Sequence, residues 1–217
     1  MADTPNRRWY QYSLRSLFVL TTLVAACCSW YAYEMNEAAK RRAAIMEINK
    51  LGGMVSYYDA SQPQFGGEPQ RWYSWLRKTH GDKYLGRVVC VDLAYCRITD
   101  AELTHLQCLT NLEELSLADT RISDAGLANL EALTNIKHLQ LENTAISDAG
   151  LVSLKSFRRL IGLGVSDTQI TDAGLVHLNG LTQLEGLDLF FTQVTDKGVA
   201  NLQEALPNCE IWHDNDQ

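Results

Sequence analysis

Two patterns of hydrophobic and polar positions divide the chain. Residues 16–33 are eighteen consecutive residues without a charge, apolar on every side of a helix. Further along, short alternating runs such as residues 115–117 are followed by leucines at three-residue spacing, as in Leu127, Leu130 and Leu133. Strict alternation predicts a strand with one buried face, and the wider spacing predicts the apolar stripe of a short helix.

The second pattern repeats every 24 residues. Leu109, Leu133, Phe157 and Leu181 begin successive copies, and a more divergent copy begins at Leu85. Each copy carries alternating leucines, then threonine or cysteine, then isoleucine or valine, then Ser/Thr-Asp and, in all but the first, a glycine two residues later. The repeats are therefore 85–108, 109–132, 133–156, 157–180 and 181–205, followed by an incomplete sixth copy, a C-terminal cap, at 206–212 and a tail at 213–217.

A single copy is too small to bury its own leucines, so the copies must stack. Parallel strands about 4.8 Å apart are expected on the concave side, with short helices on the convex side. The Ser/Thr-Asp pair predicts a helix start, in which the hydroxyl caps the helix and the carboxylate complements its first turn. In the first copy, residues 99–102 have the order of a capping box. The fold class is an α/β solenoid.

These motifs resemble leucine-rich repeats, in particular the subtype with Thr or Cys in the ladder position that occurs in F-box receptors and in many bacterial proteins. The resemblance covers more than half of the chain. With its short apolar span and the following residues 51–53, the whole chain is similar to membrane-anchored repeat proteins that form large paralogous sets in some bacteria. No F-box-like segment precedes the repeats, so ubiquitin-ligase function is not implied.

Residues 16–33 are long enough to cross a bilayer as a helix. Aromatic residues flank the span on both sides, at 9–12 and 30–33, as is typical of membrane interfaces. Arginines in the basic tail, residues 1–15, favour an N-terminus inside and the repeats outside the cytoplasm, although Lys40, Arg41 and Arg42 follow the span. An uncleaved anchor is favoured because the apolar run continues through residues 30–33. Two alternatives stay open: a cleaved signal peptide, and a lipoprotein signal, since residues 24–27 resemble a lipobox ending at Cys27.

Residues 34–84 are predicted to connect the anchor to the repeats. A helix is expected over 38–51, ended by Gly52 and Gly53, followed by a strand over 54–58. Trp72, Trp75 and Leu76 have helical spacing and are interpreted as a cap on the first repeat.

Charge is distributed unevenly along the chain, whose net charge is −7. Residues 85–212 hold eight basic and seventeen acidic side chains, a net charge of −9. An acidic surface repels polyanions, which argues against nucleic-acid binding. The six cysteines have no CxxC spacing typical of zinc or redox sites, and one disulfide among Cys90, Cys96, Cys108 and Cys209 stays open.

No catalytic, cofactor or metal site is predicted. His105 and His177 occupy the same repeat position, but three repeat steps separate them by roughly 14 Å, too far for a shared ion. The residues around Gly162 and Gly164 lack the third glycine of a dinucleotide loop. The acidic tail at 213–216 is interpreted as frayed.

Function is therefore assigned to the concave face, where we expect a monomeric chain to bind a protein or peptide. A lane of glycines is expected to let a ligand approach the backbone. The alternatives are a structural envelope component without a discrete ligand, a non-catalytic subunit of an envelope enzyme, and an enzyme with an unrecognised site. The candidate partner-binding residues on the outward strand positions and beside them are Asp92, Tyr95, Glu114, Asp119, His138, Gln140, Glu142, Asn143, Asp167, Asp188, Phe190 and Phe191.

Overall fold

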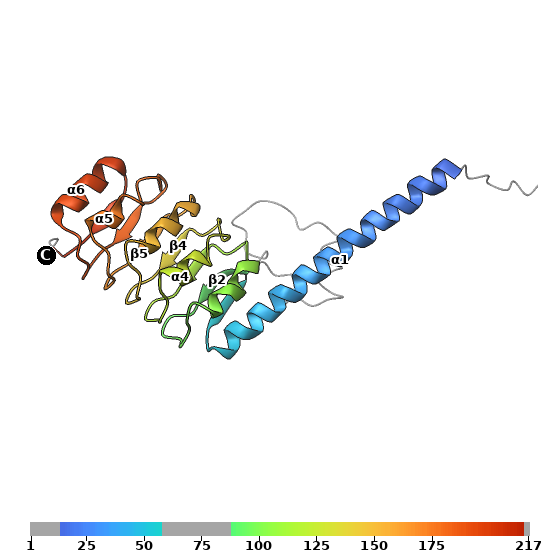
Figure 1. Ribbon diagram of the computed structural model, residues 1–217, viewed down its shortest axis with the longest axis horizontal. Coiled ribbons are helices and arrows are strands. Elements are labelled where there is room, and N and C mark those ends of the chain that lie inside the picture. Colours follow the sequence, from blue (N-terminus) through green and yellow to red (C-terminus); the bar gives the residue numbers. More distant parts are fainter. Residues whose placement is uncertain (1–13, 58–87, 215–217) are drawn as a thin grey trace, which may run out of the picture. The chain divides into compact units, whose positions relative to one another are not determined.

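The computed structural model describes residues 14–57 and 88–214, with side chains in the first range from residue 18 to residue 56 (Figure 1). The chain forms two compact units, Met1–Ala39 and Lys40–Gln217, which are taken separately below. The Trp72, Trp75 and Leu76 cap predicted from the sequence lies outside the described residues.

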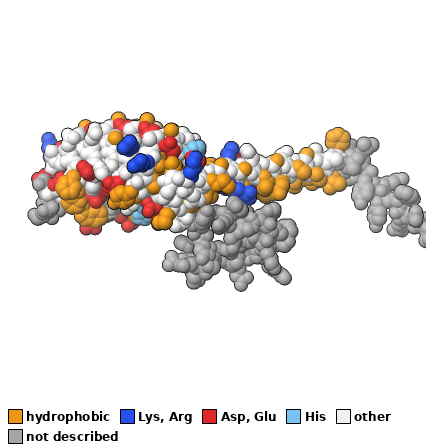
Figure 2. All heavy atoms as spheres, turned by 90° about the horizontal axis from the view of Figure 1, so that it is seen from below, with side chains coloured by type: hydrophobic (Ala, Val, Ile, Leu, Met, Phe, Trp, Pro, Cys, Tyr) orange, Lys and Arg blue, Asp and Glu red, His pale blue; other side chains and the backbone are white. Residues whose placement is uncertain are grey.

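The first unit contains most of helix α1, which runs without interruption from Leu14 to Lys50. Its residues 18–36 are all exposed, and Figure 2 shows hydrophobic side chains along it. The sequence predicts a break between the apolar span and a second helix. None forms in α1, because residues 34–39 contain no glycine or proline and propagation is favoured. The part of α1 from Phe18 to Lys50 contains an eighteen-residue window with a mean hydropathy of 1.2, and by length and composition it could cross a membrane.

The second unit begins with the last turns of α1. Ala44 and Ile48 are buried there, and Gly52 ends the helix with a φ of 89°, a left-handed conformation that suits glycine. Strand β1 (Met54–Tyr57) follows and pairs antiparallel with β2 (Val88–Asp92). These elements cover the N-terminal edge of the repeats.

Strands of successive repeats form one parallel ladder in chain order. They are β2, β3 (Glu114–Ser116), β4 (His138–Gln140), β5 (Gly162–Gly164), β6 (Gly186–Asp188) and β7 (Glu210–Trp212). In the parallel ladder, each strand residue pairs with the residue 24 positions later, as in Leu115 with Leu139 and Leu139 with Leu163. The 24-residue spacing therefore fixes the register of the sheet.

The convex elements are shorter than ordinary helices. They are η1 (Glu102–Cys108), α4 (Asp124–Ala128), η2 (Gly150–Ser156), α5 (Asp172–Leu175) and α6 (Asp196–Ala205), of which η1 and η2 are 3₁₀ helices. An α-helix is about 10 Å wide, twice the spacing of neighbouring strands, so stacked repeats favour narrow single turns. Of the convex elements in the described residues, only α6, in the last complete repeat, reaches ten residues.

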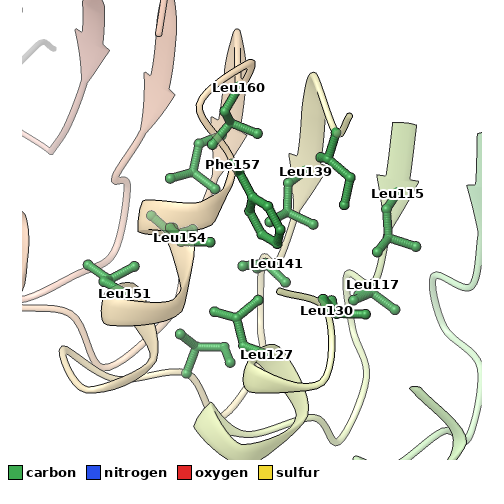
Figure 3. Close-up of a cluster of buried hydrophobic side chains, with 14 of the residues drawn as sticks. Leu115, Leu117, Leu127, Leu130, Leu139, Leu141, Leu151, Leu154, Phe157 and Leu160 are labelled. Carbon is green, nitrogen blue, oxygen red and sulfur yellow. The ribbon is translucent and has the colours of Figure 1, made fainter. Parts of the chain in front are cut away.

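The core lies between the strands and these turns. Strand leucines such as Leu139 and Leu141 and turn leucines such as Leu127 and Leu151 point into the same space, where Phe157 fills the centre (Figure 3). All five are at most 1% exposed. Because the buried leucines of each repeat pack against those of its neighbours, the repeats are stable only as a stack.

Two rows of polar side chains also recur through the repeats, one bonded within each repeat and one between repeats. In the ladder position of the repeat, Thr120, Thr144 and Thr168 are buried, and each hydroxyl donates to the carbonyl three residues earlier. On the convex side, the Asp100 carboxylate accepts the backbone N–H of Ser123 at 2.8 Å and its hydroxyl at 2.6 Å. In the same way, Asp124 accepts both bonds from Ser147, Asp148 accepts both from Thr171, and Asp172 accepts both from Thr195.

This aspartate ladder explains the glycine of each Asp-x-Gly motif. An added Cβ at Gly126, Gly150, Gly174 or Gly198 would collide with the carboxylate of the preceding repeat. The first repeat has no preceding aspartate, and its equivalent position is Glu102, whose carboxylate accepts the N–H and hydroxyl of Thr99 at 2.8 and 2.6 Å. Glu102 is thus the carboxylate acceptor for Thr99 within the first repeat, as Asp100 is the acceptor for Ser123 in the second. Both hydrogen bonds from Thr99 lower the pKa of Glu102.

Candidate functional site

The ladder brings the predicted concave residues into rows that cross the sheet. One row holds Cys90, Glu114, His138, Gly162, Gly186 and Glu210, and the next holds Asp92, Ser116, Gln140, Gly164, Asp188 and Trp212. Between the rows, Leu115, Leu139, Leu163 and Leu187 point into the core. Side chains in one row are about 4.8 Å apart from strand to strand, the spacing of paired backbones.

A further row follows the strands, where the chain bends in a left-handed conformation. Tyr95, Asp119, Asn143, Asp167 and Phe191 have φ between 50° and 60°. The bend directs each of the first four backbone N–H groups to a carbonyl of the next repeat, as from Asp119 to Glu142 at 2.9 Å. Asp and Asn tolerate this conformation well, whereas Tyr and Phe adopt it at a cost.

The lane of glycines is not open. The side chain of His138 lies 2.8 Å from where a Cβ of Gly162 would sit, and the Glu142 carboxylate covers Gly164. The ring of Trp212 lies 3.2 Å from the equivalent point on Gly186. The expectation that a ligand reaches the backbone here is therefore wrong, because larger side chains of adjacent strands fill the space.

Glu142 is half-buried in this arrangement. One of its carboxylate oxygens, Oε2, is buried without a hydrogen-bond partner. Burial raises the pKa of Glu142, and the nearby carboxylates of Asp188 and Asp119 raise it further. An orphaned oxygen among other acids is a position where a positive or hydrogen-donating group would be stabilised.

Near β2 the concave face is hollowed over about 410 Å³, between Cys90, Asp92, Glu114, Ser116, His138 and Gln140. Burial and the adjacent Glu114 raise the pKa of Cys90 above its ordinary value of 9.0, so this thiol is protonated at neutral pH. A protonated thiol is a poor nucleophile. The hollow suits binding rather than cysteine catalysis.

The other end of the face carries a pair of phenylalanine rings and, separately, the ring of Trp212. The rings of Phe190 and Phe191 have centroids 6.4 Å apart, and the Trp212 ring lies over Gly186. The Asp188 carboxylate accepts the Phe190 N–H at 3.1 Å and the Ser166 hydroxyl. The Asp214 carboxylate accepts the Phe191 N–H at 3.0 and 3.1 Å. Asp214 is thus held in place and is not part of a frayed tail.

Sequence reasoning missed Glu210, Trp212 and Asp214 because it ended the concave rows with the fifth repeat. Adding 24 to Gly186, Asp188 and Phe190 would have found all three. Within residues 14–57 and 88–214, Cys90, Cys96, Cys108 and Cys209 form no disulfide with one another. No group of three or more His, Cys, Asp or Glu side chains in the same ranges is placed to hold a metal ion.

Comparison with known proteins supports the repeat assignment. The family model for Leucine Rich repeats (2 copies) matches residues 110–156. No curated protein matches the chain. Among solved structures, the leucine-rich repeat ectodomain of an Arabidopsis thaliana receptor kinase aligns over 81% of this chain and 91% of its own, with 15% identity and a TM-score of 0.50, a likeness of fold.

Two bacterial structures also align. An internalin from Listeria monocytogenes is 28% identical over 54% of this chain, with a TM-score of 0.46. A leucine-rich repeat protein from Leptospira interrogans is 22% identical over 50% of this chain, with a TM-score of 0.40. The chain spans about a third of the internalin's length, at 32%, and 27% of the Leptospira protein.

Proposed function

We propose that this chain is a non-enzymatic interaction module, anchored in a bacterial membrane by α1, that binds a protein or peptide partner on its concave face. The carrying observation is the contrast between rows: the buried and ladder positions keep one kind of residue from copy to copy, whereas the concave positions change among acidic, polar, histidine and glycine residues along the rows. Solenoids present such faces to partners, and leucine-rich repeats are typical interaction modules.

The anchor is proposed from the composition and exposure of α1. All described side chains from residue 18 to residue 36 are exposed in the structure, including Phe18, Leu23 and Trp30. Burying such a surface in lipid removes a large apolar area from water. We propose an uncleaved span with the repeats outside the cytoplasm, in a protein of the Thr/Cys-ladder subtype.

Cross-linking in intact cells tests the interaction. Tagged full-length chain is compared with a concave variant, His138→Ala with Gln140→Ala, and with a matched convex variant, Glu131→Ala with Arg158→Ala, at exposed positions. We expect a cross-linked envelope protein with the wild type and the convex variant, and its loss with the concave variant. Absence of any cross-linked partner would favour a structural envelope component.

The anchor has a separate test. Chain extracted from membranes should retain its Met1 end and resist carbonate washing. A mature N-terminus at Cys27 carrying lipid would contradict the anchor and make the protein a lipoprotein.

A further inference from the structure

The aromatic end of the concave face leaves apolar surface in water. The Phe191 side chain is 71% exposed and lies beside Phe190, and Trp212 on the last strand is 39% exposed. We define the aromatic patch as these three residues. In Figure 2, hydrophobic and acidic side chains lie side by side on the C-terminal repeats. Large exposed aromatics side by side are typical of surfaces that meet a partner.

Folding does not explain Phe191. Its backbone is left-handed, with φ 58°, a conformation that Asp119, Asn143 and Asp167 take at the same place in the three middle repeats and Tyr95 takes in the first. A phenyl ring gains no special stability in that conformation, and an exposed ring gains little from packing. A side chain that is costly to the fold and open to solvent is best explained by something that it binds.

Charge on the same face specifies what that partner carries. The concave rows, with the left-handed row beside them, hold eight acids: Asp92, Glu114, Asp119, Glu142, Asp167, Asp188, Glu210 and Asp214. The seven Lys and Arg residues of 88–214 are Arg97, Arg121, Lys137, Lys155, Arg158, Arg159 and Lys197, and none of them occupies a concave position. The field over the face is therefore negative along its length.

We propose that the aromatic patch and its surrounding acids are the docking site of an extended cationic polypeptide segment, with arginine or lysine on either side of an apolar or aromatic side chain. This inference rests on the proposed function and gives the partner of the same face its chemistry. Asp167, Asp188 and Glu210 lie in three different rows at this end of the face and accept the basic groups, since arginine pairs with carboxylates in a fixed fork. Phe191 and Trp212 take the apolar side chain and stack with the guanidinium groups.

The carboxylates around Glu142, outside the aromatic patch, also favour a cationic ligand. The orphaned oxygen of Glu142 lies in a region where the carboxylates of Asp188 and Asp119 raise the pKa of Glu142. A bound cation removes that repulsion, whereas an anionic or neutral segment does not. The middle of the concave face at Glu142, like its C-terminal end, therefore favours a positively charged ligand.

Binding of defined probes to the full-length chain in detergent tests the proposal. The probes are fluorescein-labelled twelve-residue Gly-Ser peptides with Arg-Trp-Arg, Ser-Trp-Ser or Glu-Trp-Glu at the centre, measured by anisotropy at about 50 and 300 mM NaCl. We expect binding of the Arg-Trp-Arg probe, at least about tenfold weaker binding of the other two, and a several-fold loss at high salt, because salt screens exposed charges.

Matched variants locate the site without disturbing the fold. Phe191→Asn and Asp167→Asn introduce the residue that Asn143 shows to be accepted in the same row. Each should weaken the Arg-Trp-Arg probe about fivefold or more, whereas Glu131→Gln, the same charge change at an exposed convex position, should leave it unchanged.

Four results would overturn the proposal: equal binding of all three probes, no binding of any, binding that needs a divalent cation, or self-association of the chain that Phe191→Asn abolishes. The last would identify a second copy as the occupant. A natural partner that is cross-linked through His138 and Gln140 and not displaced by the Arg-Trp-Arg probe would overturn this inference alone. Failure to cross-link any partner would remove the proposed function instead.

Discussion

The convex and concave sides of the same repeats follow opposite rules. On the convex side, aspartate, Ser/Thr and glycine recur every 24 residues because each must fit the same groups of the next copy. On the concave side, the row through Glu114 continues as histidine, glycine, glycine and glutamate. Positions that hold the stack are constrained by the stack, and positions that face solvent are available for binding.

The largest expected difference between the two kinds of position lies within one repeat. Leu141 is 0% exposed, whereas Gln140 is exposed on the concave face. Leu141→Asp should cost several kcal/mol because it buries an unpaired carboxylate, and Gln140→Asp should cost less than about 0.5 kcal/mol. Urea unfolding of the full-length chain in detergent measures both. Similar midpoints would show that the strand register is wrong.

The aspartate ladder should behave as one coupled unit. Asp124→Ala leaves the part-buried N–H and hydroxyl of Ser147 without their acceptor and should cost about 2 kcal/mol. Gly150→Ala should cost a similar amount, because its Cβ displaces the same carboxylate. Once Asp124 has been removed, Gly150→Ala should cost much less. Additive losses in this double-mutant cycle would mean that the glycine serves another purpose.

The sequence predicted the stack, the strand register and the buried leucines, because 24-residue spacing and alternation are local signals. It assigned the Ser/Thr-Asp aspartates only to their own helix starts, as first-turn charges. Their acceptor role lies 23 residues further along the chain, and recognising it requires the offset between stacked copies. Likewise, Gly162 and Gly164 looked open because a sequence does not show that His138 and Glu142 lean over them.

A concave carboxylate gives a smaller effect, of opposite sign. Glu142 has a raised pKa, so the fold prefers its protonated form and loses stability as pH rises from the ordinary value of 4.5 through the higher folded pKa. Glu142→Gln should therefore increase the free energy of unfolding at pH 7 by about 1 kcal/mol. The increase should vanish at pH 4. Exposed Glu131→Gln is the matched control, with a change below about 0.5 kcal/mol at both pH values.

Substitutions in the left-handed row should change stability least, and two reciprocal substitutions test the sign of the change. Phe191→Asn relieves an aromatic residue in an unfavourable conformation and should raise stability by up to about 1 kcal/mol. Asn143→Phe should lower it, since it also removes the 2.6 Å hydrogen bond from Asn143 to Asp119. Thermal unfolding of both variants checks the signs. A loss of stability in Phe191→Asn would mean that the ring contributes to the fold.

The central claim is that the concave rows are dispensable for folding. It is tested most directly by the unfolding free energy of a single variant, His138→Glu with Gln140→Ser and Glu142→Ala, which gives the third repeat the concave residues of the second. The account predicts a value within about 1 kcal/mol of the wild type. A loss of several kcal/mol, comparable with that expected for Leu141→Asp, would show that the concave face is part of what holds the stack together.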